Sequence, residues 1–191
     1  MTQIDDEREK RLREATRRFQ RVALELHSES DRGCAVLLLC LLEDALKEMI
    51  VGFLVDGGAD RTNSLAPPGR LKVAIDNAVL LGLLSERQAR TFQSLVKVRN
   101  KFAHGVMEGL TFDSPEIASA VKSIAPAVQL PDAQDRELRS ETIRKQFLTH
   151  ASIVWIVMAL RSAFTTRLQP AEDPDSSKIA RDIYQAQFKQ T

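Results

Sequence analysis

The sequence predicts an all-α fold, a single-domain helical bundle of about six to seven helices. Stretches with the helical spacing of apolar residues occupy most of the 191 residues, and no run of alternating β-branched residues indicates a strand. Aromatic residues make up only 5% of the chain, so the core consists mainly of Leu, Val, Ile and Ala. Such a core suits helix-on-helix packing.

The N-terminal part predicts two long helices and then a loop. Residues 1–30 form a charged N-terminal helix, in which basic and acidic side chains are interleaved as on a solvated face. The next helix begins with Asp31 as its N-cap and ends near residue 55, and its first half is apolar on all sides, as in a central helix. Residues 56–70, "DGGADRTNSLAPPGR", are interrupted by Gly and Pro and predict a loop long enough to be functional.

The middle of the chain carries clear helix boundaries. A helix is expected over residues 70–81. Ser85 and Gln88 have the spacing of a capping box, which opens a helix over residues 85–104. Gly105 is expected to end this helix in the left-handed conformation.

The C-terminal part predicts a short helix, a linker, a long helix and a tail. The pair Ser114–Pro115 supplies an N-cap and a first helical residue. Residues 125–135 are interpreted as a linker, and a long helix follows over residues 136–168. Residues 169–191 form a polar tail, so the helical bundle domain spans residues 31–168.

Charge and cysteine usage narrow the class of protein. A net charge of +1 gives no global basic field, although a local basic patch remains open. Cys34 and Cys40 lie in one apolar run and are expected to be buried thiols. That run meets Glu43 too soon for a membrane span, and the charged N-terminus differs from a signal peptide. We therefore expect a cytoplasmic protein without a membrane partner.

Motifs for cofactors and metals are missing from the sequence. It has no phosphate-binding glycine loop, no dinucleotide fingerprint and no nucleophile elbow. His27, His104 and His150 are far apart and lack the spacing of metal ligands. His150 is expected to be a satisfied core histidine. We expect neither a cofactor nor a metal.

The stretch "RNKFAH" places Arg99, Asn100 and His104 within six positions. On an ideal helix Asn100 and His104 share a face, whereas Arg99 and His104 diverge by about 140°. Arg99 and His104 converge only if the helix loosens near His104 or if a second copy of the chain supplies the complementary groups. Chemically the three suit RNA cleavage without a metal, with His104 moving a proton, Arg99 holding the phosphate and Asn100 orienting either.

The same residues also fit a purely structural interpretation. Arg99 then pairs with an acid such as Glu43, His104 caps the helix C-terminus, and Asn100 satisfies a backbone group. The residue types alone leave both interpretations open.

The sequence also resembles two known protein families. "RNKFAH" resembles the R-x(4–6)-H motif of the HEPN superfamily, and "LLEDALKEMI" resembles the acidic-then-lysine pattern of its preceding core helix, here Glu43 and Lys47. These two are also spaced for a helical ion pair. Residues 31–124, in particular "RLKVAIDNAVLLGLLSERQARTFQSLVKVRNKFAH", are similar to the mannitol operon repressor family.

The resemblance implies an all-α bundle that is often dimeric. Catalytic HEPN proteins are metal-independent endoribonucleases, which implies Arg99 for the phosphate, His104 for proton transfer and Asn100 for support. Glu43 and Lys47 would be supporting polar residues of the core. Mannitol repressor relatives are regarded as regulators, and many HEPN domains bind without catalysis.

Three hypotheses follow. The first is an endoribonuclease related to toxins or defence, with an Arg-x4-His site at a homodimer interface. RNA would then be bound by basic residues of the same helix: Arg87, Arg90, Lys97 and Lys101. The second is a non-catalytic transcriptional regulator that acts through protein contacts, and the third is a structural interaction domain. An antitoxin or a regulatory protein is the expected partner in these settings.

An obligate dimer is also expected to bury an apolar helix face. The last long helix offers Ile153, Ile156, Val157 and Leu160 for this role, or for packing within the domain.

Overall fold

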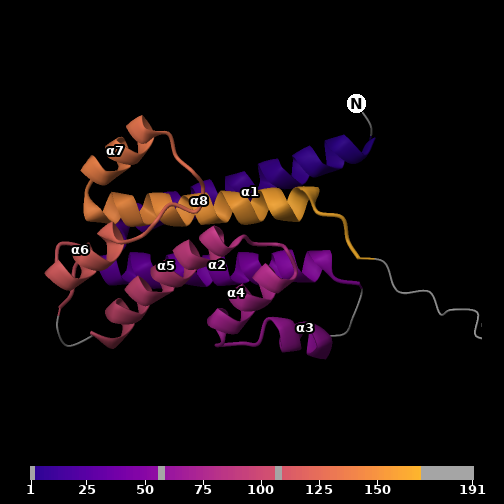
Figure 1. The fold of residues 1–191 in the computed structure, drawn as a ribbon, viewed down its shortest axis with the longest axis horizontal. Coiled ribbons are helices and arrows are strands. Elements are labelled where there is room, and N and C mark those ends of the chain that lie inside the picture. The colour runs from indigo at the N-terminus through magenta and orange to yellow at the C-terminus, as the bar shows by residue number, and fades with distance from the viewer. Residues whose placement is uncertain (1–2, 56–58, 106–108, 169–191) are drawn as a thin grey trace, which may run out of the picture.

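The computed structural model describes residues 3–55, 59–105 and 109–168. Within these ranges the chain is a bundle of eight helices without a strand, which confirms the all-α prediction and exceeds the expected number of helices by one (Figure 1). The helices are α1 Gln3–Ser28, α2 Asp31–Phe53, α3 Ala59–Leu65, α4 Leu71–Leu80, α5 Glu86–His104, α6 Pro115–Lys122, α7 Asp132–Ser140 and α8 Ile143–Phe164.

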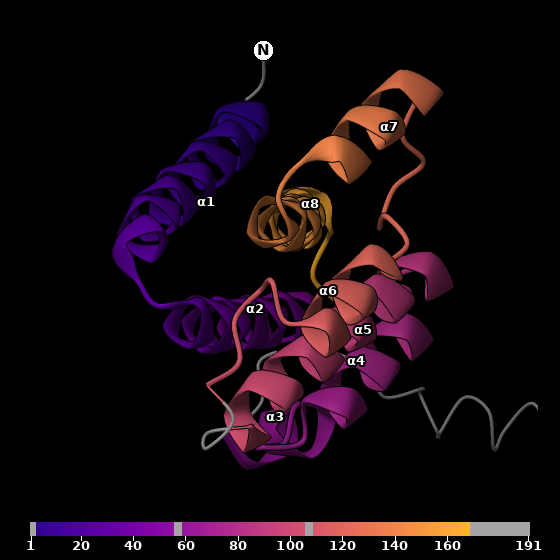
Figure 2. The same ribbon diagram turned by 90° about the vertical axis from the view of Figure 1, so that its left-hand side faces the viewer.

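Helices α2 and α8 run side by side through the middle of the bundle, in the same direction. Their first turns are joined by an ion pair between Asp31 and Arg144, and their far ends by a hydrogen bond from the Leu168 N–H to the Phe53 carbonyl. Figure 2 looks along α8 and shows α1, α2, α7 and the layer of α4, α5 and α6 arranged around it. This arrangement exists because α2 and α8 have apolar residues on several sides and can be buried by several neighbours.

Helix α8 is long and apolar enough to cross a bilayer by length and composition alone. In the bundle its side chains Phe147, Ala151 and Val154 are buried against other helices. The packing is therefore that of a central core helix.

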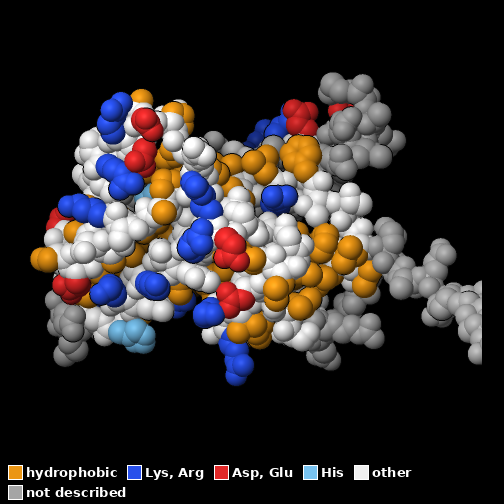
Figure 3. Space-filling view, in the orientation of Figure 1, with side chains coloured by type: hydrophobic (Ala, Val, Ile, Leu, Met, Phe, Trp, Pro, Cys, Tyr) orange, Lys and Arg blue, Asp and Glu red, His pale blue; other side chains and the backbone are white. Residues whose placement is uncertain are grey.

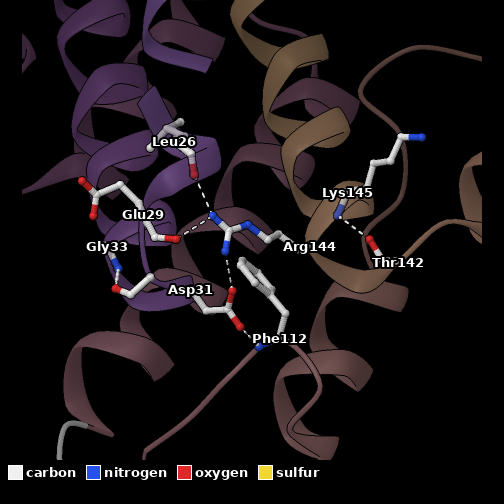
Figure 4. A network of polar contacts seen from close by, with 9 residues as sticks. Leu26, Glu29, Asp31, Gly33, Phe112, Thr142, Arg144 and Lys145 are labelled. Atoms are coloured by element: carbon white, nitrogen blue, oxygen red, sulfur yellow. Dashed lines mark hydrogen bonds and ion pairs between the residues drawn. The ribbon is translucent and has the colours of Figure 1, made fainter. Parts of the chain in front are cut away.

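A polar cluster ties four segments together at the start of α2 (Figure 4). The two oxygens of Asp31 accept hydrogen bonds from Arg144 at 2.7 Å and from the Phe112 N–H at 2.8 Å. The same guanidinium donates to the carbonyls of Leu26 at 2.6 Å and Glu29 at 2.8 Å. Since Leu26 ends the buried part of α1 and Phe112 precedes α6, this cluster fixes how α1, α2, α8 and the segment before α6 meet.

Several helix boundaries agree with the sequence. Ser85 accepts from the Gln88 N–H while the Gln88 side chain accepts from the Ser85 N–H, which confirms the capping box of α5. Ser114 is the N-cap of α6 and Pro115 is its first residue, also as predicted.

The predicted loop over residues 56–70 is wrong in part, because residues 59–65 form α3. The Asn77 side chain donates to the Leu65 carbonyl at 2.7 Å and so satisfies the end of this short helix. Asn77 belongs to α4, so the sequence of residues 56–70 alone could not predict this contact.

The predicted single helix over residues 136–168 is also wrong, because the chain breaks between α7 and α8. Thr142 caps α8 by accepting from the Lys145 N–H, and the Gln146 side chain donates to the carbonyls of Arg139 and Glu141. These bonds satisfy the carbonyls at the end of α7, which itself begins at Asp132 inside the expected linker.

Three smaller expectations are corrected. The N-cap of α2 is Ser30, whose side chain accepts from the Gly33 N–H at 3.0 Å, and Asp31 is the first helical residue. Gly105 follows α5 with φ −81°, which is not the left-handed conformation. Cys34 is buried as expected, whereas Cys40 is exposed.

Candidate functional site

The exposed face of α5 is a row of cations that ends at a histidine. Taken at 100° per residue, the basic residues Arg87, Arg90, Lys97 and Lys101 together with His104 fall within a sector of about 100°. All five side chains are exposed. We call these five residues the α5 basic stripe.

Helix α5 is strongly basic for a protein of net charge +1. It has five Lys or Arg residues against a single acid, Glu86, which lies in its first turn. Figure 3 shows Lys and Arg side chains gathered over α5 on the face that faces the viewer. The local patch that the net charge left open is therefore present on this helix.

Asn100 lies about 40° from His104 on the same helix and is half-buried at the edge of the stripe. Neither side chain has a hydrogen bond or ion pair with any residue in the described ranges. Both are thus available to a ligand, as the catalytic interpretation requires. Among the described residues Asn100 makes no backbone contact, whereas His104 does lie as a basic residue in the last turn of α5, where the structural interpretation expects it.

The Arg99 side chain lies on a different face of α5 from His104 and Asn100. It lies about 20° around the helix from Phe92 and 40° from Leu95, which are fully buried, and about 140° from His104. Its side chain is half-buried, and its Nε atom is buried without a hydrogen-bond partner in the described part of the chain. Helix α5 continues regularly through His104, so the loosening that would bring Arg99 and His104 together in one chain does not occur.

The end of α5 is held by a residue that the sequence did not single out. Arg32 in the first turn of α2 donates from its Nη2 atom to the Gly105 carbonyl at 2.9 Å. Its neighbour Asp31 binds the Phe112 N–H. Asp31 and Arg32 of α2 therefore hold Phe112 and Gly105, the two ends of the segment that follows His104. The Arg32 guanidinium thus lies next to the end of the α5 basic stripe.

Arg32 carries no signal in the sequence, since 73 residues separate it from its acceptor. Only the packing of α2 against α5 brings the two together.

Glu43 and Lys47 do not have the expected roles. No ion pair joins them, and Glu43 makes none with Arg99, among the described side chains. Glu43 is half-buried, whereas Lys47 is exposed, which contradicts its expected place in the core. Both line a groove of about 280 Å³ between α2 and the segment before α4, together with Cys40, Pro67 and Pro68.

The other histidines lie outside this site. His150 is buried on α8, but its Nδ1 atom has no partner among the described residues, so it is a core histidine that is not fully satisfied. Burial and, to a smaller extent, the nearby Arg139 together lower the pKa of His150 to about 4, although Asp135 acts in the opposite direction. The His27 side chain lies outside the described part of the chain. Nowhere in the described ranges do three or more His, Cys, Asp or Glu side chains gather as a metal site would require.

Comparison of the chain with protein-family models, with curated proteins and with solved structures finds no match. The resemblance to the HEPN superfamily and to the mannitol operon repressor family therefore stays a prediction. The geometry of α5 is what supports any functional conclusion.

Proposed function

We propose that this chain is a metal-independent endoribonuclease that acts as a homodimer in the cytoplasm. The observation that carries the proposal is the α5 basic stripe, which leads to an exposed and unpartnered His104. RNA carries one negative charge per nucleotide, and a row of Lys and Arg side chains neutralises successive phosphates. The stripe would thereby guide an RNA strand past the imidazole.

In this proposal His104 performs the proton transfers. One His104 takes the proton of a ribose 2′-hydroxyl while the oxygen attacks the adjacent phosphorus. The 5′-oxygen leaves and takes a proton from water, and His104 returns its proton to the solvent. The products are a 2′,3′-cyclic phosphate and a free 5′-hydroxyl. Asn100, on the same face, would orient the imidazole or the phosphate.

Arg99 requires the second copy. Its guanidinium lies on the packed side of α5, so within one chain it does not share a face with His104. We assign Arg99 of one subunit to the phosphate bound beside His104 of the other, where its permanent charge stabilises the transition state.

One observation favours a second candidate, the non-catalytic regulator. Arg99 is half-buried beside Phe92 and Leu95, as a residue that only shapes the helix packing would be. A regulator would retain the basic stripe for weak RNA or DNA contact, act through a protein partner and tolerate the loss of His104.

Cleavage of RNA in EDTA separates the two candidates. The parent is compared with His104→Ala and Arg99→Ala, with Lys122→Ala on α6 as a control that removes one exposed charge outside the stripe. Circular dichroism confirms equal folding. We expect cleavage with 2′,3′-cyclic phosphate ends in the parent and the control, and a loss of at least about 100-fold in both site variants. Absence of cleavage, or cleavage that survives both substitutions, would favour the regulator.

A further inference from the structure

Helix α8 leaves an apolar face uncovered at its C-terminal half. Ile156 is 52% exposed, Leu160 39% and Phe164 55%. At 100° per residue these three and the half-buried Ile153 fall within a sector of about 80°. We call these four residues the α8 apolar stripe. An aligned row of large exposed apolar residues on a central helix indicates a surface that is covered by something else.

The described part of the chain ends at residue 168, shortly after this same helix. Thr165 is the C-cap of α8, the Arg167 Nε atom donates to the Leu54 carbonyl at 2.6 Å, and the Leu168 N–H donates to the Phe53 carbonyl. These contacts hold the exit point beside the end of α2. Another 23 residues, 169–191, follow in the sequence.

The sequence of that tail has the pattern of an amphipathic helix. Over residues 178–189 its four large apolar residues, Ile179, Ile183, Tyr184 and Phe188, fall within one half of a helical wheel. The four charged residues, Lys178, Arg181, Asp182 and Lys189, all fall in the other half. Two serines, residue types that favour helix starts, directly precede this stretch.

The length of the connection is sufficient. Residues 169–178 span up to about 33 Å when extended. The distance along α8 from Phe164 back to Ile156 is about 12 Å, at 1.5 Å per residue. A segment leaving at Leu168 therefore reaches the whole α8 apolar stripe.

A second copy of the chain is a poorer fit to this face. Arg144 at the start of α8 and Gly105 at the end of α5 both bind the first turn of α2, so His104 lies at that end of the bundle. The stripe from Ile153 to Phe164 begins about 14 Å further along α8 and ends about 30 Å along it. In Figure 1 the end of α5 and the end of α8 lie at opposite ends of the molecule. Contact through this stripe would not bring two His104 side chains together.

We propose that residues 178–189 of the tail form an amphipathic helix that docks on the α8 apolar stripe of the same chain. Burying four large apolar side chains of the tail against it removes from water a surface that the bundle leaves exposed. The docking itself does not depend on RNA cleavage, whereas the preference for the tail over a second copy rests on the proposed dimeric site at His104.

The protein contains the reporters for a test, since Trp155 is its single tryptophan and Tyr184 its single tyrosine. Trp155 directly precedes Ile156 of the stripe, and Tyr184 lies in the tail. Energy transfer from Tyr184 to Trp155 is measured in the full chain, as the tyrosine contribution to the excitation spectrum of tryptophan emission. We expect this contribution in the parent, its loss in Ile183→Asp and in Leu160→Asp, and its retention in Gln185→Asp. The last variant adds the same charge to the polar half of the tail.

The outcomes decide the proposal even if Leu160→Asp folds poorly, because Ile183→Asp changes only the tail. No tyrosine contribution in the parent, or one that persists in Ile183→Asp, would overturn it. Mixing Trp155→Phe chains with Tyr184→Phe chains identifies the acceptor. We expect no transfer in the mixture, whereas transfer there would show that the tail covers a second copy and would overturn docking on the same chain.

Discussion

At the scale of single residues, the ion pair of Asp31 and Arg144 connects more segments of the bundle than any residue of the proposed site does. Both side chains are only about a quarter exposed, at 23% and 26%, and they take part in four hydrogen bonds to other segments and to each other. Removing one partner leaves a guanidinium without its counter-charge in a partly buried place.

Asp31→Ala should therefore lower the free energy of unfolding by about 1.5–3 kcal/mol, the range for hydrogen bonds to charged groups. Urea denaturation measures this as a lower midpoint with an unchanged slope. Asp113→Ala, at an exposed position nearby in the sequence, is the control and should change stability little. Equal stability of Asp31→Ala and the parent would contradict the role given to the cluster.

His150 makes stability depend on pH. Its pKa is about 4 in the folded protein because burial disfavours the charged form, and about 6.5 when unfolded. Between these values the unfolded chain binds the proton more strongly, so stability rises as pH increases from 4 to 6.5 and is lost as pH falls. Over this whole pH range, the proton binding of His150 changes the free energy of unfolding by about 3 kcal/mol.

His150→Gln should flatten this part of the stability curve relative to the parent. Denaturant midpoints between pH 4 and 7 measure it, with His104→Ala as the control because His104 is exposed. A parent and a His150→Gln variant with parallel curves would show that His150 does not titrate in this way.

At the scale of helices, sequence patterns predicted those elements whose determinants are local. The capping box of Ser85 and Gln88 lies within four residues, and the apolar periodicity of α5 is contained in α5 itself. The features that were missed depend on side-chain bonds that apolar periodicity does not show. Helix α3 ends against Asn77 of the next helix, and the break before α8 is satisfied by Gln146, which donates to the carbonyls of Arg139 and Glu141.

The candidate site divides in the same way. The basic stripe and the divergence of Arg99 from His104 follow from residue spacing along one helix. Two other features depend on how the helices pack, and no single stretch of sequence could predict them. They are the hydrogen bond from Arg32 to Gly105 and the exposure of Lys47.

The α5 basic stripe predicts a salt-dependent interaction with RNA. Lys97→Glu combined with Lys101→Glu should reduce the slope of log affinity against log salt concentration by about one for each lysine removed. Filter binding or fluorescence anisotropy at several salt concentrations measures the slope. Arg136→Glu, an exposed charge on α7, is the control, and an equal effect there would mean that the stripe has no special role.

At the scale of the whole molecule, the bundle positions two surfaces at its two ends. The start of α2 gathers the end of α5, the start of α8 and the end of α1, and so places His104 next to a rigid polar cluster. The far end presents the α8 apolar stripe and the exit of the tail. Substitutions at one surface therefore leave the other unchanged, which makes the tests of the proposed cleavage and of the proposed tail docking independent.

In the proposed dimer, Arg99 of one subunit and His104 of the other form one RNA-cleaving site. The most direct measurement mixes two inactive proteins, Arg99→Ala and His104→Ala, and assays RNA cleavage in EDTA after subunit exchange. A mixed dimer has one site with an intact Arg99 from one chain and an intact His104 from the other. The account predicts that cleavage returns in the mixture. If each variant alone is inactive and the mixture stays inactive as well, the site is not formed across two subunits.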